Sequence, residues 1–111
     1  MLDINMEFRK GILFVRLDGE LTKNTVGYMD KEVITRIKKS GINNVVYNLE
    51  NLRELDMKGI HSLLYTYEIN KNNNGRTLVC GINDNVKRII KNSRMLNYVN
   101  EIGSEIKAFT L

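Results

Sequence analysis

The stretch "NVVYNLENLRELDMKGIHSLLYTYE", residues 44 to 68, decides the fold. It opens with the nearly continuous apolar run 44–49, which is typical of a strand covered on both faces. A loop is expected from Glu50 to Asp56, and the carboxylate of Asp56 suits the N-cap of a helix. The core side of that helix is marked by apolar residues at helical spacing, namely Ile60, Leu63, Leu64 and Tyr67. The stretch therefore predicts a strand, a loop and an amphipathic helix.

The opposite side of this helix carries a mixed set of side chains. Lys58, His61, Ser62 and Tyr65 follow one another at three- and four-residue steps, and Met57 lies at the edge of the core side. One interpretation is a solvated helix face with a single exposed tyrosine, because exposed apolar residues are common. The other is a docking face, because aromatic residues and methionine are enriched in the cores of interfaces. Residue types alone leave both interpretations open.

Two residues in the first turn of the helix break local rules. The positive charge of Lys58 opposes the helix dipole at a cost of about 0.3–1 kcal/mol, unless a nearby acid such as Glu54 or Asp56 offsets it. Gly59 costs about 1 kcal/mol relative to alanine, and is expected where another backbone or a partner comes close. The preceding loop follows the carboxyl end of a strand, where open α/β sheets bind ligands and partners. The combination predicts a functional surface.

The rest of the chain alternates between strand and helix patterns in the same way. Strand patterns cover residues 4–8, 11–17, 76–82 and 98–102, with a turn at 18–22. Helical patterns cover residues 24–39, a segment that Asn83 or Asp84 can cap, and residues 104–111. Strand–helix–strand repeats imply right-handed parallel crossovers. We therefore expect one α/β domain over residues 1–111, a small mixed β-sheet of four to five strands layered with about four helices.

Composition excludes several classes of protein. The 111 residues are 42% hydrophobic and 27% charged, which is ordinary for a globular domain. The net charge is +4, but the positive residues are spread out except on one helix, so a solvated helix face is expected rather than nucleic-acid binding. No apolar run approaches the roughly 20 residues of a membrane span, and no signal segment begins the chain. A cytoplasmic protein with no membrane partner is expected.

No set of residues suggests catalysis or metal binding. Cys80 and His61 are the single cysteine and histidine, so neither a disulfide framework nor a Cys/His metal site can form. Cys80 lies in an apolar run and is expected to be a buried small hydrophobe. Glycine-rich nucleotide loops are missing, and the acids are scattered. We therefore predict no enzyme activity, no cofactor and no metal.

Four stretches carry a resemblance to a known family. They are "VRLDGELT" at 15–22, "NVVYNLENLRELD" at 44–56, Gly59 with its following "IHSLL", and "LVCGINDNVKRII" at 78–90. In this order and spacing, the chain resembles the STAS-domain anti-sigma factor antagonists of bacteria. The resemblance implies a small mixed sheet layered with helices. It also implies a protein that binds an anti-sigma factor, often itself a serine kinase, and so releases a sigma factor.

The chain departs from the family's pattern at the regulatory loop. In the family, the kinase phosphorylates a serine in an Asp-Ser-Ser/Thr-Gly motif at the start of the helix, which blocks binding until a phosphatase resets it. Asp56 and Gly59 match the ends of that motif, but Met57 and Lys58 stand at the hydroxyl positions. Met57, at the phospho-acceptor position, has no hydroxyl and cannot be phosphorylated. Ser62 could substitute, although an ordinary solvated position is expected for it.

We predict a partner-binding surface with Met57 and Tyr65 as apolar anchors. Its predicted members are Glu20, Thr22, Asn24, Leu52, Arg53, Asp56, Met57, Lys58, Gly59, His61 and Tyr65. The partner would be an anti-sigma factor, possibly a serine kinase, and the protein itself a monomer or weak oligomer. Two alternatives stay open. One is a scaffold STAS module in a larger signalling assembly, and the other is a sensor of a nucleotide or lipid near residues 18–24 and 50–58.

Overall fold

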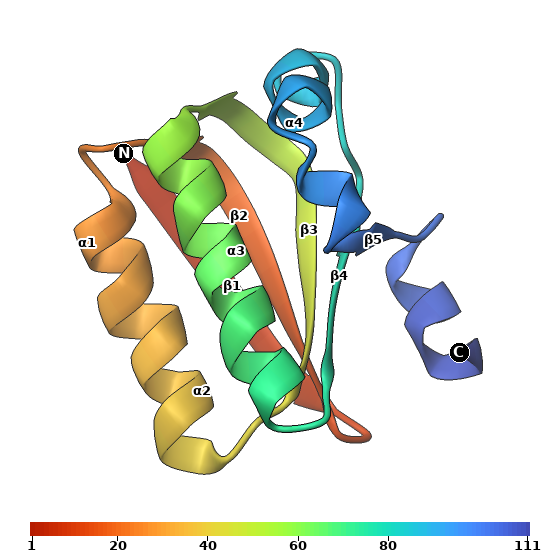
Figure 1. The fold of residues 1–111 in the computed structure, drawn as a ribbon. Helices are drawn as coiled ribbons and strands as arrows, with labels where there is room; N and C mark the ends of the chain where they lie inside the picture. Colours follow the sequence, from red (N-terminus) through yellow and green to blue (C-terminus); the bar gives the residue numbers. More distant parts are fainter.

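The computed structural model describes all residues from 1 to 111 and contains one mixed five-stranded sheet (Figure 1). The strands lie side by side in chain order. The first pair is antiparallel and every later pair is parallel. Their bounds are β1 (Leu2–Arg9), β2 (Ile12–Leu21), β3 (Asn44–Leu55), β4 (Arg76–Cys80) and β5 (Asn100–Glu101). The predicted α/β class with a small mixed sheet is confirmed.

The helices occupy the crossovers between the parallel strands. Their bounds are α1 (Val26–Met29), α2 (Thr35–Ser40), α3 (Met57–Asn72) and α4 (Lys87–Ser93), and 3-10 turns cover Met95–Asn97 and Glu105–Thr110. A π-helical turn over Asp30–Ile34 joins α1 and α2 into one rod, which ends at Gly41 with a φ of 64°. None of the helices combines the length and the apolarity that crossing a membrane requires.

The two faces of the sheet are covered differently. The helices lie over one face (Figure 1), where alternate β2 residues such as Leu13 and Val15 join the main core. The second face has a smaller apolar cluster, made of Phe14, Val46, Leu78, Cys80 and Ala108. Burial raises the pKa of the Cys80 thiol to about 11, with nearby acids adding to the shift, so the thiol stays protonated and unreactive. The predicted buried role of Cys80 is confirmed.

The turn predicted at 18–22 and the loop predicted at 50–56 are wrong. β2 continues to Leu21 and β3 to Leu55, and the two strand ends pair in parallel. Two register shifts each add one residue to β3, and they explain why its buried leucines come three apart, at Leu49, Leu52 and Leu55. Side chains of a regular strand alternate with a period of two residues, so apolar residues spaced three apart among polar ones do not resemble a strand. For this reason the sequence pattern suggested a loop.

Asn83 supports this bulged part of β3. Its side-chain amide donates to the main-chain oxygens of Leu49, Glu50 and Leu52 at 3.0, 3.0 and 2.8 Å. Asn83 also holds the turn that leads into α4: its side-chain oxygen accepts the Asn85 N–H at 2.8 Å, and its main-chain oxygen accepts the Val86 and Lys87 N–H groups at 3.2 and 3.0 Å. The helix itself begins at Lys87, with Val86 at the N-cap position and no side-chain cap. The predicted capping by Asn83 is therefore found at the turn before Lys87, and not at the N-cap position of α4 itself.

The remaining differences are shorter elements near the carboxyl end. β4 ends at Cys80, before the predicted limit of residue 82, and β5 is only two residues long. The final segment is a 3-10 turn over Glu105–Thr110, where a helix was predicted. The last two elements lie at the β5 edge of the sheet or follow it, where a strand has a pairing partner on one side only.

Candidate functional site

Asp56 joins the start of α3 to the loop after β2. One carboxylate oxygen accepts the Gly59 N–H at 2.9 Å, and the other accepts the Lys23 N–H at 2.9 Å. Burial raises the pKa of this carboxyl, but hydrogen bonds from the backbone N–H groups of Gly59, Lys23 and Lys58 outweigh it, so the net pKa is lowered. The predicted N-cap is confirmed, and the same side chain places residues 22–24 beside the start of the helix.

Gly59 allows α3 to sit directly on the end of β2. The residue is buried, and an added Cβ would overlap the main-chain oxygen of Leu21 and press on the Leu55 side chain. The close approach that the glycine predicted is therefore to the protein's own backbone. It holds the start of the helix in a fixed position relative to the strand ends.

Tyr65 is held on the outer face of α3 by Lys38 of α2. The Lys38 ammonium donates to the Tyr65 hydroxyl at 2.8 Å and lies 5.1 Å from the centre of its ring. Tyr65 is 45% exposed and Met57 is 48% exposed. Both are large apolar groups on a face otherwise formed by Lys58 and His61, which are also exposed.

No acidic side chain pairs with Lys58. The ion pairs of the structure involve the N-terminus, Arg9 and Arg16, so neither Glu54 nor Asp56 offsets the lysine charge within salt-bridge distance. Lys58 therefore presents an unpaired positive charge in the first turn of α3, where the helix dipole disfavours it.

The structure brings most of the predicted contact residues to one end of the sheet. We call the exposed members, together with Tyr65 about two turns further along α3, the α3 entry surface: Asn24, Arg53, Met57, Lys58, His61 and Tyr65. Glu20 and Asp56 are half-buried at its edge. The pairing of Glu20 with Glu54 across β2 and β3 brings these strand ends next to the helix start.

Thr22, Leu52 and Gly59 are buried and not available on this surface. Leu52 is fully buried because the β3 bulges turn it into the main core. Thr22 is 5% exposed, and its hydroxyl accepts the Asn24 N–H at 3.3 Å inside the loop. The prediction that these residues contact the partner directly is therefore wrong. They support the surface from beneath.

Ser62 is buried, so the solvated position expected for it is wrong. It is 5% exposed, and its hydroxyl donates to the Asp30 carboxylate at 2.7 Å. It begins a buried polar row along α3: Thr66 bonds to Tyr47 at 2.6 Å, and Asn70 donates to Thr77 at 2.7 Å. Four-residue spacing of polar side chains was the signal in the sequence that could have revealed this second inward stripe.

The two main cavities lie away from the α3 entry surface, and no metal-binding cluster accompanies it. No group of three or more His, Cys, Asp or Glu side chains is arranged to hold a metal ion. One cavity of about 540 Å³ and another of about 260 Å³ are both lined by residues outside 18–24 and 50–58. The surface offers exposed apolar side chains among charged ones, a combination that suits contact with another protein.

A protein-family model described as the STAS domain matches residues 3–108. The chain belongs to the STAS domain family. This STAS domain is 29% identical over 109 residues to a Paenibacillus polymyxa protein named anti-sigma F factor antagonist, across 98% of this chain and 93% of the relative. It is 30% identical over 95 residues to the anti-sigma-B factor antagonist of Staphylococcus aureus, across 84% of this chain and 86% of the relative.

A solved structure agrees with this STAS domain in fold. The Bacillus cell fate determinant SpoIIAA in its phosphorylated form superimposes with a TM-score of 0.74 at 19% identity, covering 97% of each chain. At this identity the similarity concerns the fold alone. The family model and the two relatives confirm the resemblance to STAS-domain anti-sigma factor antagonists. The solved structure confirms the architecture.

Proposed function

We propose that this STAS domain is a regulatory protein that binds an anti-sigma factor through the α3 entry surface and thereby releases a sigma factor. The observation that carries the proposal is the exposure of Tyr65 and Met57, at 45% and 48%, on an otherwise polar helix face. Two relatives named as antagonists of anti-sigma factors support the class of partner. We expect the protein to act in the cytoplasm, where sigma factors work.

Binding by this surface follows from its composition. Tyr65 and Met57 are residue types enriched in interface cores, and Lys58 and His61 can pair with acidic groups of a partner around them. Tyr65 loses little conformational freedom on binding because Lys38 already holds its hydroxyl. The partner is therefore expected to present an apolar patch with acidic residues at its rim.

We further propose that this loop is not controlled by phosphorylation. Met57 and Lys58 lack hydroxyls, and Ser62, the nearest serine on α3, is bonded to Asp30 and buried. A phosphate on a helix N-terminus would be well held by free N–H groups, so the scaffold for a switch is present without its acceptor.

Direct binding assays test the partner. The purified anti-sigma F factor of Paenibacillus polymyxa and anti-sigma-B factor of Staphylococcus aureus would serve as probes in calorimetry, together with affinity purification from the source cell and mass spectrometry. We expect an anti-sigma factor among the captured proteins and a one-to-one complex. A large homogeneous assembly of this chain in light scattering, with no anti-sigma factor captured, would instead favour the scaffold alternative.

A gain-of-function variant tests the missing switch. With the captured partner and ATP, wild type should take up no phosphate on the peptide covering residues 52–62. Met57→Ser should be labelled there if the partner is a kinase, because the flanking Asp56 and Gly59 are in place. Stoichiometric phosphate on the wild-type peptide would refute this part of the proposal.

A further inference from the structure

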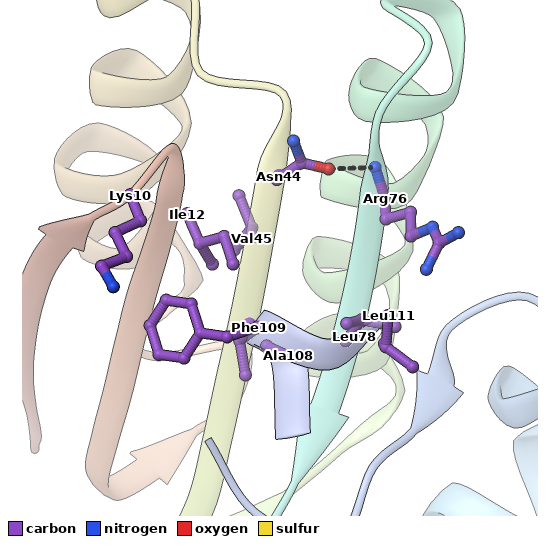
Figure 2. Close-up of a pocket in the computed structure, with 10 residues that line it drawn as sticks. Lys10, Ile12, Asn44, Val45, Arg76, Leu78, Ala108, Phe109 and Leu111 are labelled. Atoms are coloured by element: carbon purple, nitrogen blue, oxygen red, sulfur yellow. Dashed lines mark hydrogen bonds between the residues drawn. The ribbon is translucent and has the colours of Figure 1, made fainter. Parts of the chain in front are cut away.

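The cavity of about 540 Å³ lies on the sheet face that carries the smaller apolar cluster (Figure 2). Ile12, Val46 and Leu78 contribute from three neighbouring strands, and Ala108 and Phe109 from the C-terminal turn. Ile12 begins β2, and Val46 and Leu78 are each the third residue of their strands, so the cavity lies toward the amino ends of the parallel strands, whereas α3 begins at their carboxyl ends. The volume is within the range of small-molecule sites.

The cavity is lined mostly by hydrophobic residue types, and its two charged residues are positive. Seven of its ten lining residues are hydrophobic, and the others are Lys10, Asn44 and Arg76. The Asn44 side chain is already used, because its oxygen accepts the Arg76 N–H at 3.1 Å (Figure 2) and its amide donates to Asn43. No acid lines the cavity, so the two cations remain for a ligand.

The charges of Lys10 and Arg76 are not paired with an acid, although the Lys10 ammonium lies 5.8 Å from the centre of the Phe109 ring. Neither side chain forms an ion pair. On the same face, Arg16 bonds to Glu105 at 2.8 Å and to Glu7 at 2.9 Å. On this face Arg16, beside the cavity, is thus paired with acids, whereas Lys10 and Arg76, which line the cavity, are not. An uncompensated positive charge beside apolar walls is complementary to an anion that carries a hydrocarbon chain.

The C-terminal turn covers the cavity incompletely. Glu105 anchors it through Arg16 and through the Asn48 amide at 2.9 Å, and Ala108 is buried against the sheet. Phe109 and Leu111, which also line the cavity, remain 36% and 64% exposed. An acyl chain lying in the cavity would cover apolar surface that these two side chains now expose to water.

We propose that this cavity binds a single-chain anionic amphiphile of the fatty-acid class. The hydrocarbon chain lies on Ile12, Val46 and Leu78, beneath Phe109. The carboxylate pairs with one of the two cations that flank the cavity, Lys10 on one side or Arg76 on the other, whose side chains extend away from each other (Figure 2). The site is independent of the proposed anti-sigma factor binding, because the cavity lies on the sheet face opposite the helices and the α3 entry surface lies on the helices.

Displacement of a fluorescent fatty acid tests the site in the full chain. Cis-parinaric acid would be bound first and displaced by palmitate below its micelle concentration. We expect saturable one-to-one binding, weaker displacement by hexadecanol, which has the chain without the charge, and little binding to phosphatidylglycerol vesicles. Hexadecanol competing as well as palmitate, or the absence of saturable binding, would overturn the proposal. Binding to vesicles alone would assign the cations to a lipid headgroup and also overturn it.

A charge-matched pair of variants locates the site. Lys10 and Arg76 are both exposed, and the double substitution Lys10→Gln with Arg76→Gln should weaken palmitate binding by about tenfold or more. The control Lys87→Gln with Arg88→Gln on α4 removes the same charge and should leave the affinity unchanged. Equal losses in both would show only non-specific attraction.

Ile12→Trp, checked by its melting curve, should block binding by filling the cavity. A dimer in light scattering that excludes palmitate would assign the face to a second copy and overturn the proposal.

Discussion

Gly59 of α3 lies directly against the main-chain carbonyl of Leu21 at the end of β2, with no room for a side chain between them. This contact fixes how the start of the helix meets the sheet. The capping residue Asp56, the loop held at Lys23 and the exposed Met57 are all built around it. Stability and function of the α3 entry surface therefore share one backbone contact.

Gly59→Ala should destabilise the domain by about 2–3 kcal/mol, because the methyl group forces apart two backbone segments. The free energy of unfolding would be measured by urea titration. Gly27→Ala is the matched control, since Gly27 lies in α1 with open space around the position of a Cβ. There alanine should stabilise by up to about 1 kcal/mol. Equal effects of the two substitutions would contradict the packing seen at Gly59.

Asp56→Ala should cost about 1 kcal/mol of stability, because it removes the N-cap and frees the Lys23 N–H. Asp56→Asn should cost less, since its single oxygen can keep the bond to Gly59. Because the carboxyl pKa is lowered in the folded state, its stabilisation is present above the unfolded pKa of about 3.9 and is lost as pH falls through the folded value. Urea titrations at neutral and acid pH would show the difference between wild type and variant shrinking.

Tyr65→Ala should weaken binding to the captured anti-sigma factor at least tenfold while changing stability by less than about 1 kcal/mol. The ring is exposed and its main contact is Lys38, so the fold depends little on it. Calorimetry and a melting curve measure the two effects. Tyr98→Ala is the control, because Tyr98 is also exposed but packs on Tyr67. Unchanged affinity in Tyr65→Ala would remove Tyr65 from the interface.

Glu105→Gln should destabilise the domain by about 1 kcal/mol at neutral pH and loosen the C-terminal turn. The hydrogen bonds from Arg16, opposed by burial and aided by Asn48, lower the pKa of the Glu105 carboxyl. Its contribution is therefore complete above the unfolded pKa of about 4.3 and disappears as pH falls through the folded value. Unfolding curves of wild type and variant should converge at acid pH. Glu32→Gln, at an exposed residue without an ion pair, should change nothing.

Asn83→Ala should cost about 2 kcal/mol, since three carbonyl oxygens of β3 lose their donor. Loosening the bulged strand should also lower partner affinity, because this strand leads into the α3 entry surface. Asn85→Ala is the control at an exposed neighbour and should stay within about 0.5 kcal/mol of wild type. Matching losses in the two variants would argue against the special role of Asn83.

Features governed by nearby residues could be predicted from the sequence. The cap at Asp56 depends on N–H groups within one turn, and the exposure of Lys58, His61 and Tyr65 follows from helical periodicity. The order of strands and helices follows in the same way from local patterns of apolar residues.

Features that depend on a second element could not be predicted. Leu52 is buried because bulges in β3 turn it inward, and Ser62 is buried because the turn between α1 and α2 brings Asp30 to it. The cavity beside Arg76 exists because the C-terminal turn folds back over the open sheet face, a contact far along the chain.

The sequence by itself determined the α/β alternation, the STAS resemblance and the absence of a hydroxyl group at Met57 and Lys58, because each depends on residue type and short spacing. Only the tertiary structure decided that Thr22 and Leu52 lie beneath the α3 entry surface, and where cations are left without an acidic partner. Burial and pairing depend on what another part of the chain brings alongside, and local patterns do not encode that.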